Sequence, residues 1–180
     1  MSYEAELHGR RNKAAGQMFE KMIENASEEY KRRGIASIEK TPEPVKFLKR
    51  LENGRFVGCY EKKAQPDFKG VLMDGTCIVF DAKHTDNDRI QQDAVSEEQA
   101  RFLDTYEKLN AHCYVIVGMD FQYFFRVPWS IWKNMKEKFG HKYMSRVELW
   151  PYRVPSRIFI AYLEGVEIND NSAEGTGTED

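Results

Sequence analysis

The chain of 180 residues has few cysteines and no long apolar run. Its three cysteines, Cys59, Cys77 and Cys113, are odd in number and lack the spacing of a zinc site, so we expect buried free thiols in a reducing cytoplasm. The longest apolar stretch, residues 113–119, is far too short to cross a bilayer. The polar first residues carry no targeting signal. We therefore expect an untargeted, cytoplasmic protein with no membrane association and no organic cofactor.

Basic residues are absent after Leu163, and six acidic residues lie there: Glu164, Glu167, Asp170, Glu174, Glu179 and Asp180. The whole chain has 27 Lys and Arg against 29 Asp and Glu, so the remainder without these six acids is mildly basic. Residues 9–50 alone contain 11 basic and 6 acidic side chains. This asymmetry favours contact of the N-terminal part with a polyanion. We expect residues 164–180 to form a disordered acidic tail.

Hydrophobic periodicity and turn residues predict an alternation of helices and strands. A helix is expected at 12–33, with an apolar stripe that includes Met18, Met22, Phe19, Ile23 and Ala26. The other expected elements are a strand at 35–40, a hairpin at 45–62 that turns at Asn53-Gly54, strands at 68–73 and 76–83, a loop at 84–95, a helix at 96–110, strands at 112–119 and 121–127, a helix at 128–139 and a last strand at 157–163. This order predicts an α/β domain with a mixed sheet.

Two carboxylates and an ammonium group lie at one end of the hairpin that turns at Asp74-Gly75. Asp67 follows a proline just before the first strand, and Asp81 and Lys83 end the second strand, which is otherwise apolar. Such a cluster is suited to holding a divalent metal ion and activating water against a phosphodiester. The alternative is an exposed ion pair at the end of a strand, contributing under about 1 kcal/mol. An acid-x-Lys triplet occurs four times in the chain, so the triplet alone does not decide between the two.

A longer pattern resembles the RecU-type Holliday junction resolvases, a branch of the PD-(D/E)xK nuclease superfamily. The residues that carry the resemblance are Gly9-Arg10-Arg11, Gly16, Glu20, Thr41-Pro42-Glu43-Pro44-Val45, Asp67-Phe68-Lys69-Gly70, Phe80-Asp81-Ala82-Lys83-His84-Thr85, Glu98-Gln99, Gly118-Met119-Asp120 and Tyr123-Phe124. Asp81 departs from the pattern, because the family more often has Glu there, and the segment between Pro44 and Asp67 is shorter. The resemblance does not distinguish a cellular from a phage member.

The resemblance implies a single restriction-endonuclease-like α/β domain at 1–163, with a mixed central sheet flanked by helices and a projecting hairpin arm at about 42–65. It further implies a homodimeric, Mg²⁺-dependent endodeoxyribonuclease, with Mn²⁺ as a substitute, that resolves four-way junction DNA by paired symmetric nicks in recombination and repair. Two rivals remain open. One is a nuclease of the same superfamily that acts on linear duplex DNA, and the other is a non-catalytic junction-binding accessory protein.

Five side chains are the candidates for the active site. Asp67 and Asp81 would bind the metal, and Lys83 would orient or deprotonate the attacking water or stabilise charge on the phosphate. Glu20 occupies the position of the family's helical acid, and the alternative is an exposed helix glutamate. By resemblance Gln99 faces the active site and is a third candidate metal ligand, yet Ser96-x-x-Gln99 also fits a helix capping box. His84 should face away from Lys83, which favours a surface or phosphate-contacting role.

The candidate DNA contacts lie in two basic segments. They are Arg10, Arg11 and Lys13 near the first helix, and Lys46, Lys49, Arg50, Lys62 and Lys63 in the arm. Apolar side chains such as Phe47 and Phe56 alternate with the cations of the arm, which suits unstacked base pairs next to phosphates. The alternative for these two phenylalanines is packing in a dimer interface.

Overall fold

The computed structural model describes residues 3–42, 44–60 and 65–166. The helices are α1 (Tyr3–Arg32), α2 (Glu97–Lys108), α3 (Trp129–Lys133), α4 (Met135–Phe139) and α5 (Arg146–Leu149). The strands are β1 (Ala36–Lys40), β2 (Val45–Arg50), β3 (Phe56–Tyr60), β4 (Phe68–Leu72), β5 (Cys77–Thr85), β6 (Arg89–Gln91), β7 (His112–Met119), β8 (Tyr123–Pro128), β9 (Tyr143–Ser145) and β10 (Arg153–Val154). Within these residues, no helix is both long and apolar enough to span a membrane.

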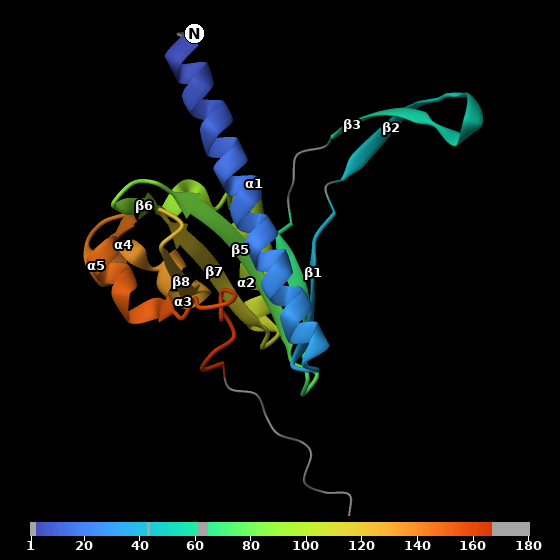
Figure 1. Cartoon of the computed structure of the whole chain (residues 1–180). Coiled ribbons are helices and arrows are strands. Elements are labelled where there is room, and N and C mark those ends of the chain that lie inside the picture. The colour runs from blue at the N-terminus through green and yellow to red at the C-terminus, as the bar shows by residue number, and fades with distance from the viewer. Residues whose placement is uncertain (1–2, 43, 61–64, 167–180) are drawn as a thin grey trace, which may run out of the picture.

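The described residues form a central six-stranded sheet in the order β1-β4-β5-β7-β8-β10. β5 and β7 pair in parallel, and the other neighbours in the sheet are antiparallel. The long helix α1 crosses one face of the sheet (Figure 1). On the other face, α2 packs against β5 and β7, and α3 packs against β7 and β8. The expected α/β architecture with a mixed sheet is therefore confirmed.

The central strand β5 is buried on both faces, which explains its nearly continuous apolar sequence. Ile78 and Phe80 belong to the core beneath α1, whereas Val79 belongs to the core beneath α2 and α3. Next to it, β4 lies very close to β1, because a Cβ atom on Gly70 would be 2.1 Å from the Ser37 carbonyl oxygen. A larger residue at position 70 would push these two strands apart. This glycine therefore keeps the end of β1 next to the start of β4.

Helix α1 begins at Tyr3, nine residues before the predicted start at residue 12. Phe19, Ile23 and Ala26 are fully buried against the sheet, as the predicted stripe requires. Met18 is 59% exposed, so its place in the stripe is wrong, because it lies about 100° around the helix from Phe19. The first turns project beyond the body of the domain (Figure 1).

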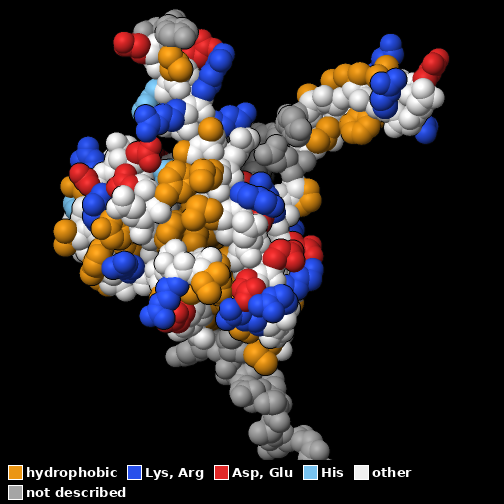
Figure 2. Space-filling view, viewed as in Figure 1, with side chains coloured by type: hydrophobic (Ala, Val, Ile, Leu, Met, Phe, Trp, Pro, Cys, Tyr) orange, Lys and Arg blue, Asp and Glu red, His pale blue; other side chains and the backbone are white. Residues whose placement is uncertain are grey.

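The predicted hairpin arm forms a separate two-stranded sheet of β2 and β3. Its turn contains Asn53 and Gly54, both at positive φ, as the hairpin signal predicts. The arm extends away from the body, and apolar side chains cover much of it (Figures 1 and 2). Phe47 and Phe56 are more than half exposed, with ring centroids 6.1 Å apart. Cys59 is also exposed on β3, so the expectation of three buried thiols is wrong at this position.

Three further predictions of secondary structure are wrong. The expected loop at 84–95 contains β6, which pairs with β9 and buries Ile90 against the core. The expected helix at 128–139 is divided into α3 and α4 at Asn134. The expected strand at 157–163 is irregular, and β10 pairs with β8 in its place. Residues of this last segment are still buried, because the Tyr162 hydroxyl contacts the Ser27 hydroxyl of α1 at 2.8 Å.

Candidate active site

Pairing of β4 with β5 brings Asp67 and Asp81 together. Phe68 lies opposite Phe80, so Asp67, one residue earlier, lies opposite Asp81. Both carboxylates are buried, with Asp67 4% and Asp81 0% exposed. The Lys83 ammonium is 2.5 Å from Asp81 Oδ2 and 4.0 Å from Asp67 Oδ2. This buried position excludes the exposed ion pair that the sequence left open.

Backbone and side-chain donors fix the two carboxylates in place. The Ala82 N–H donates to Asp67 Oδ2 at 3.0 Å, and the Asp67 N–H donates to Asp81 Oδ1 at 3.3 Å. The Gln99 side-chain amide donates to the same Asp81 oxygen at 2.7 Å. Each carboxylate is thus held by N–H groups whose positions follow from the sheet and from α2. Such a cluster is ordered before any ligand arrives.

Burial raises the pKa of a carboxyl group and lowers the pKa of a lysine. Burial raises the pKa of Asp81 to about 8, the Lys83 ammonium lowers it, and the Asp67 carboxylate raises it again. Burial disfavours the charged form of Lys83, but the Asp81 and Asp67 carboxylates outweigh this and raise the pKa of Lys83 above its usual value. The lysine is therefore an ammonium at neutral pH. A further cation beside the two acids would favour the ionised form of Asp81, as the Lys83 ammonium does.

Gln99 occupies the helix cap and the active site at the same time. Its backbone N–H donates to the Ser96 hydroxyl at 3.3 Å, and its side-chain carbonyl accepts from the Ser96 N–H at 3.1 Å, which completes the capping box of α2. The amide end of the same side chain donates to Asp81. The same side chain therefore completes the cap and contacts Asp81, a candidate metal ligand. In this arrangement the Gln99 side-chain oxygen is used by the cap.

Glu20 lies on α1 and is held by a lysine that sequence reasoning does not single out. The Lys40 ammonium at the end of β1 is 2.8 Å from Glu20 Oε2 and 3.5 Å from Glu24 Oε1. The hydrogen bond to Glu20 raises the pKa of Lys40. Glu20 is also close enough to Lys83 to raise the pKa of that lysine. Glu20 is thus a half-buried, paired acid beside the cluster.

His84 is enclosed by aromatic rings. Its side chain is 4% exposed, and its ring stacks on Phe121 with centroids 4.0 Å apart and lies 6.0 Å from Phe19. The expected surface position is therefore wrong. Burial lowers the pKa of His84, which keeps the ring neutral in this apolar setting.

The donors of the cluster fit a small oxygen-binding cation. Two carboxylates converge there, and Asp81 Oδ2 has no hydrogen bond beyond its ion pair with Lys83. The buried hydroxyl of Thr41, which follows β1 and lies next to Asp67, makes no hydrogen bond within the described part of the chain. Among the residues that the structure describes, no three Asp, Glu, His or Cys side chains form a ready metal cage. Mg²⁺ commonly binds through one or two carboxylates and keeps several waters, which this donor set allows.

The candidate DNA contacts are exposed wherever the structure describes them. Arg10, Arg11 and Lys13 lie on the projecting part of α1, and Lys46, Lys49 and Arg50 lie on β2 of the arm. The projecting helix and the arm extend from the same end of the body (Figure 1). Lys62 and Lys63 fall outside the described residues, as do residues 167–180 of the expected tail.

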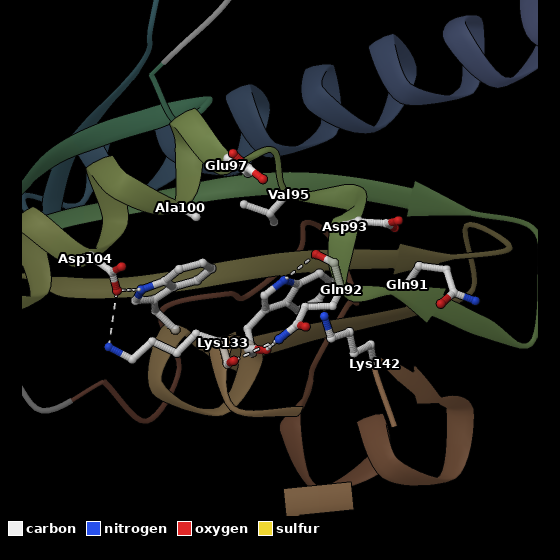
Figure 3. Close-up of a pocket in the computed structure, with 11 residues that line it drawn as sticks. Gln91, Gln92, Asp93, Val95, Glu97, Ala100, Asp104, Lys133 and Lys142 are labelled. Atoms are coloured by element: carbon white, nitrogen blue, oxygen red, sulfur yellow. Dashed lines mark hydrogen bonds and ion pairs between the residues drawn. The ribbon is translucent and has the colours of Figure 1, made fainter. Parts of the chain in front are cut away.

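A separate cavity of about 390 Å³ lies between α2, α3 and the segment 91–95 (Figure 3). Its polar groups bind each other: the Trp129 indole N–H donates to Asp104 at 2.8 Å, and the Trp132 indole N–H donates to the Gln92 carbonyl at 3.1 Å. Lys133 also binds Asp104, at 3.3 Å. These contacts join α3 to α2 and to the segment 91–95, so we assign the cavity to the structural framework of the domain.

Similarity to known proteins identifies the family of the chain. The family model RecU, described as Recombination protein U, matches residues 14–168. A solved structure of Archaeoglobus fulgidus Hjc, a Holliday junction resolvase from an archaeal hyperthermophile, is similar at a TM-score of 0.47 and 11% identity, and the match covers 77% of this chain and 89% of that chain. No curated protein matches.

The family model places the chain among proteins of DNA recombination. Because the family model spans most of the chain, the chain belongs to the RecU family, which confirms the resemblance. It is accordingly a Holliday junction resolvase that acts in DNA recombination. Arg10, Arg11 and Lys13 precede the matched residues.

Proposed function

We propose that the chain is a Mg²⁺-dependent, homodimeric endodeoxyribonuclease that resolves four-way junctions by paired symmetric nicks. The observation that carries this proposal is the buried cluster of Asp67, Asp81 and Lys83. A binding module gains nothing from burying two acids side by side, because each raises the energy of the other. A hydrolase gains a place for a divalent cation.

Asp67 and Asp81 are the residues that would hold the metal, with the Ala82 carbonyl as a further oxygen. A bound Mg²⁺ supplies a Lewis acid that activates water and neutralises phosphate charge, and Mn²⁺ accepts the same oxygen donors. The raised pKa of Lys83 favours its role as a cation that stabilises charge on the phosphate over a role as a base. Gln99 keeps Asp81 oriented through its amide. A direct Gln99 contact with the metal would require its oxygen to leave the cap.

The projecting helix and the arm are the proposed DNA-binding elements. Their exposed cations, Arg10, Arg11, Lys13, Lys46, Lys49 and Arg50, suit phosphates, with Lys62 and Lys63 as further candidates. The exposed Phe47 and Phe56 suit unstacked bases at the junction centre. A four-way junction is nearly two-fold symmetric, and a two-fold dimer supplies two sites in matching orientation for the two cuts.

The deciding experiment compares cleavage of a synthetic four-way junction and a matched linear duplex, in Mg²⁺, Mn²⁺ and EDTA. The wild type should cut the junction at two symmetric positions with either metal and neither substrate in EDTA. Asp81→Asn and Lys83→Ala should cut at least ~100-fold more slowly, while junction binding in Ca²⁺ persists. The control is Lys69→Ala, which changes an exposed lysine in another acid-x-Lys triplet and should keep full activity.

Each alternative has its own outcome. Equal cutting of duplex and junction would identify a duplex nuclease. Junction binding by the wild type without cleavage would identify an accessory protein. Near wild-type cleavage by Asp81→Asn would show that the assigned site is wrong.

A further inference from the structure

Thr41 carries a buried hydroxyl without a partner beside the acidic cluster. The residue is 5% exposed, and its Oγ1 atom makes no hydrogen bond in the part of the chain that the structure describes. Burying a hydroxyl without a hydrogen bond is unfavourable, and a valine of the same shape would avoid this. The hydroxyl therefore calls for a partner that the described part of the chain does not provide.

The register of the sheet places Thr41 in one row with the two acids. Lys40 lies opposite Phe68, and the Thr41 N–H donates to the Asp67 carbonyl at 2.8 Å, so Thr41 lies opposite Asp67. Asp67 in turn lies opposite Asp81. Directly opposed residues of paired strands put their side chains on the same face. Three neighbouring strands thus align a hydroxyl and two carboxylates.

The distance between the strands decides whether the Thr41 hydroxyl could bind the metal directly or only through a water molecule. Asp67 is in the middle of the row, so Thr41 is two strands away from Asp81, or roughly 10 Å at the backbone. A cation shared by Asp67 and Asp81 would be too far from Thr41 for direct binding by its short side chain. One water molecule spans such a gap, and Mg²⁺ retains several waters when bound.

We propose that Thr41 is a positioning residue of the metal site, whose hydroxyl binds a water of the hydration shell of the metal held by Asp67 and Asp81. This inference rests on the proposed function, because it requires a metal at these two acids. Groups that orient the ligands of a metal typically change its affinity by about 10- to 100-fold. Thr41 directly follows β1 and precedes the arm, so the hydroxyl holds the metal at the side where the arm joins the body.

The test measures metal binding by the full chain without DNA, as Mn²⁺ affinity by electron paramagnetic resonance and as the Mg²⁺-induced rise in unfolding temperature. Thr41→Val should unfold without metal at or above the wild-type temperature, yet bind Mn²⁺ about 10-fold or more weakly. Thr41→Ser should restore binding. Thr105→Val, which removes a hydroxyl from an exposed position of α2, is the matched control and should bind as the wild type does.

Two results would overturn the role of Thr41 alone. One is wild-type Mn²⁺ affinity in Thr41→Val, and the other is a lower unfolding temperature of that variant without metal, which would show that the hydroxyl has a structural partner. Metal binding by Asp81→Asn distinguishes a failure of the Thr41 role from a failure of the proposed metal site. If the wild type bound no metal, or if Asp81→Asn bound metal as tightly as the wild type, both the assigned metal site and the role of Thr41 would be wrong.

Discussion

Replacing Gln99 by alanine is the sharpest test of how this site is built, because one side chain serves both the helix and Asp81. The substitution removes the acceptor for the Ser96 N–H and the donor to Asp81 Oδ1. Asp81 Oδ1 is then left with the longer hydrogen bond from the Asp67 N–H, at 3.3 Å, while Oδ2 keeps its ion pair with Lys83. Loss of a donor to a buried carboxylate favours its protonated form. Metal binding, which needs the ionised form, should weaken.

The expected loss of stability has two parts. Loss of a capping interaction costs about 1 kcal/mol, and loss of a hydrogen bond to a buried charged group costs about 1.5 to 3 kcal/mol. For a domain of this size, each kcal/mol lowers the unfolding temperature by roughly 2 to 4 °C. Gln99→Ala should therefore unfold roughly 5 to 15 °C below the wild type, and its metal affinity should fall about 10-fold or more.

Ser96→Ala is the matched control, because it breaks the same capping box and leaves the Asp81 contact in place. It should lose about 1 kcal/mol and keep its metal affinity. Gln99→Glu does the reverse, because it keeps the capping interaction and changes the contact with Asp81. Glutamate serves this position in the capping box of α5, where Ser145 pairs with Glu148, so the cap should survive while a second carboxylate faces Asp81. Its dependence on Mg²⁺ concentration should change.

Calorimetry or a thermal melt, together with a Mn²⁺ titration, measures both effects on the same samples. The reasoning fails if Gln99→Ala and Ser96→Ala lose equal stability and both keep wild-type metal affinity. In that case Gln99 is a cap residue and its contact with Asp81 has no consequence. If Gln99→Ala bound metal more weakly but kept its stability, the capping interaction of Gln99 would not stabilise the domain.

Two further predictions concern the arm and the charge of Asp81. Replacing residues 46–62 by a short Gly-Ser linker should erase the preference for junction over duplex in competition binding and leave the unfolding temperature nearly unchanged, since β2 and β3 form their own sheet. Retained preference would make the arm structural. Without metal, Asp81→Asn should gain stability relative to the wild type as the pH rises from 3.8 to about 8, because the folded wild type keeps a proton that the unfolded chain releases over this range. Parallel unfolding curves against pH would contradict the raised pKa of Asp81.

Local sequence signals were sufficient for the part of the fold that carries the acids. Asp74-Gly75 marks a tight turn, and the apolar run before Asp81 marks a buried strand, so the register that opposes Asp67 to Asp81 follows from local chemistry. The arm follows in the same way from Asn53-Gly54. These elements are short hairpins, whose pairing depends on residues close in sequence.

Elements that depend on distant partners could not be predicted in the same way. The described side chains in the first turns of α1 are exposed and show no apolar period, and local contacts such as the Arg10–Glu6 ion pair at 2.7 Å support these turns. The short strand β6 is defined by β9, more than fifty residues later. Residues 157–163 have the apolar content of a strand, but their buried side chains pack on α1 while β10 takes the sheet edge.

The site itself shows why sequence reasoning sets up false alternatives. From the sequence alone, a capping box and a contact with the candidate active site are alternatives, because each requires the Gln99 side chain. A primary amide has two ends, however, and the helix α2 is placed so that the oxygen reaches Ser96 while the nitrogen reaches Asp81. The packing of α2 against β5 decides this, and no spacing in the sequence encodes it. Lys40 is missed for the same reason, because its partner Glu20 lies on another element.

The two departures of this chain from the family pattern act on separate parts of the molecule. The shorter segment, between Pro44 and Asp67, contains the strands β2 and β3 of the arm. The base of the arm is closed by the hydrogen bond from the Thr41 N–H to the Asp67 carbonyl, which continues the β1–β4 register. A change in arm length therefore alters its reach and leaves Asp67 in place. Asp81, by contrast, has one methylene fewer than Glu, and its carboxylate lies closer to the backbone of β5. Gln99 and the Asp67 N–H both reach it there, so the shorter acid is matched by donors that approach it directly.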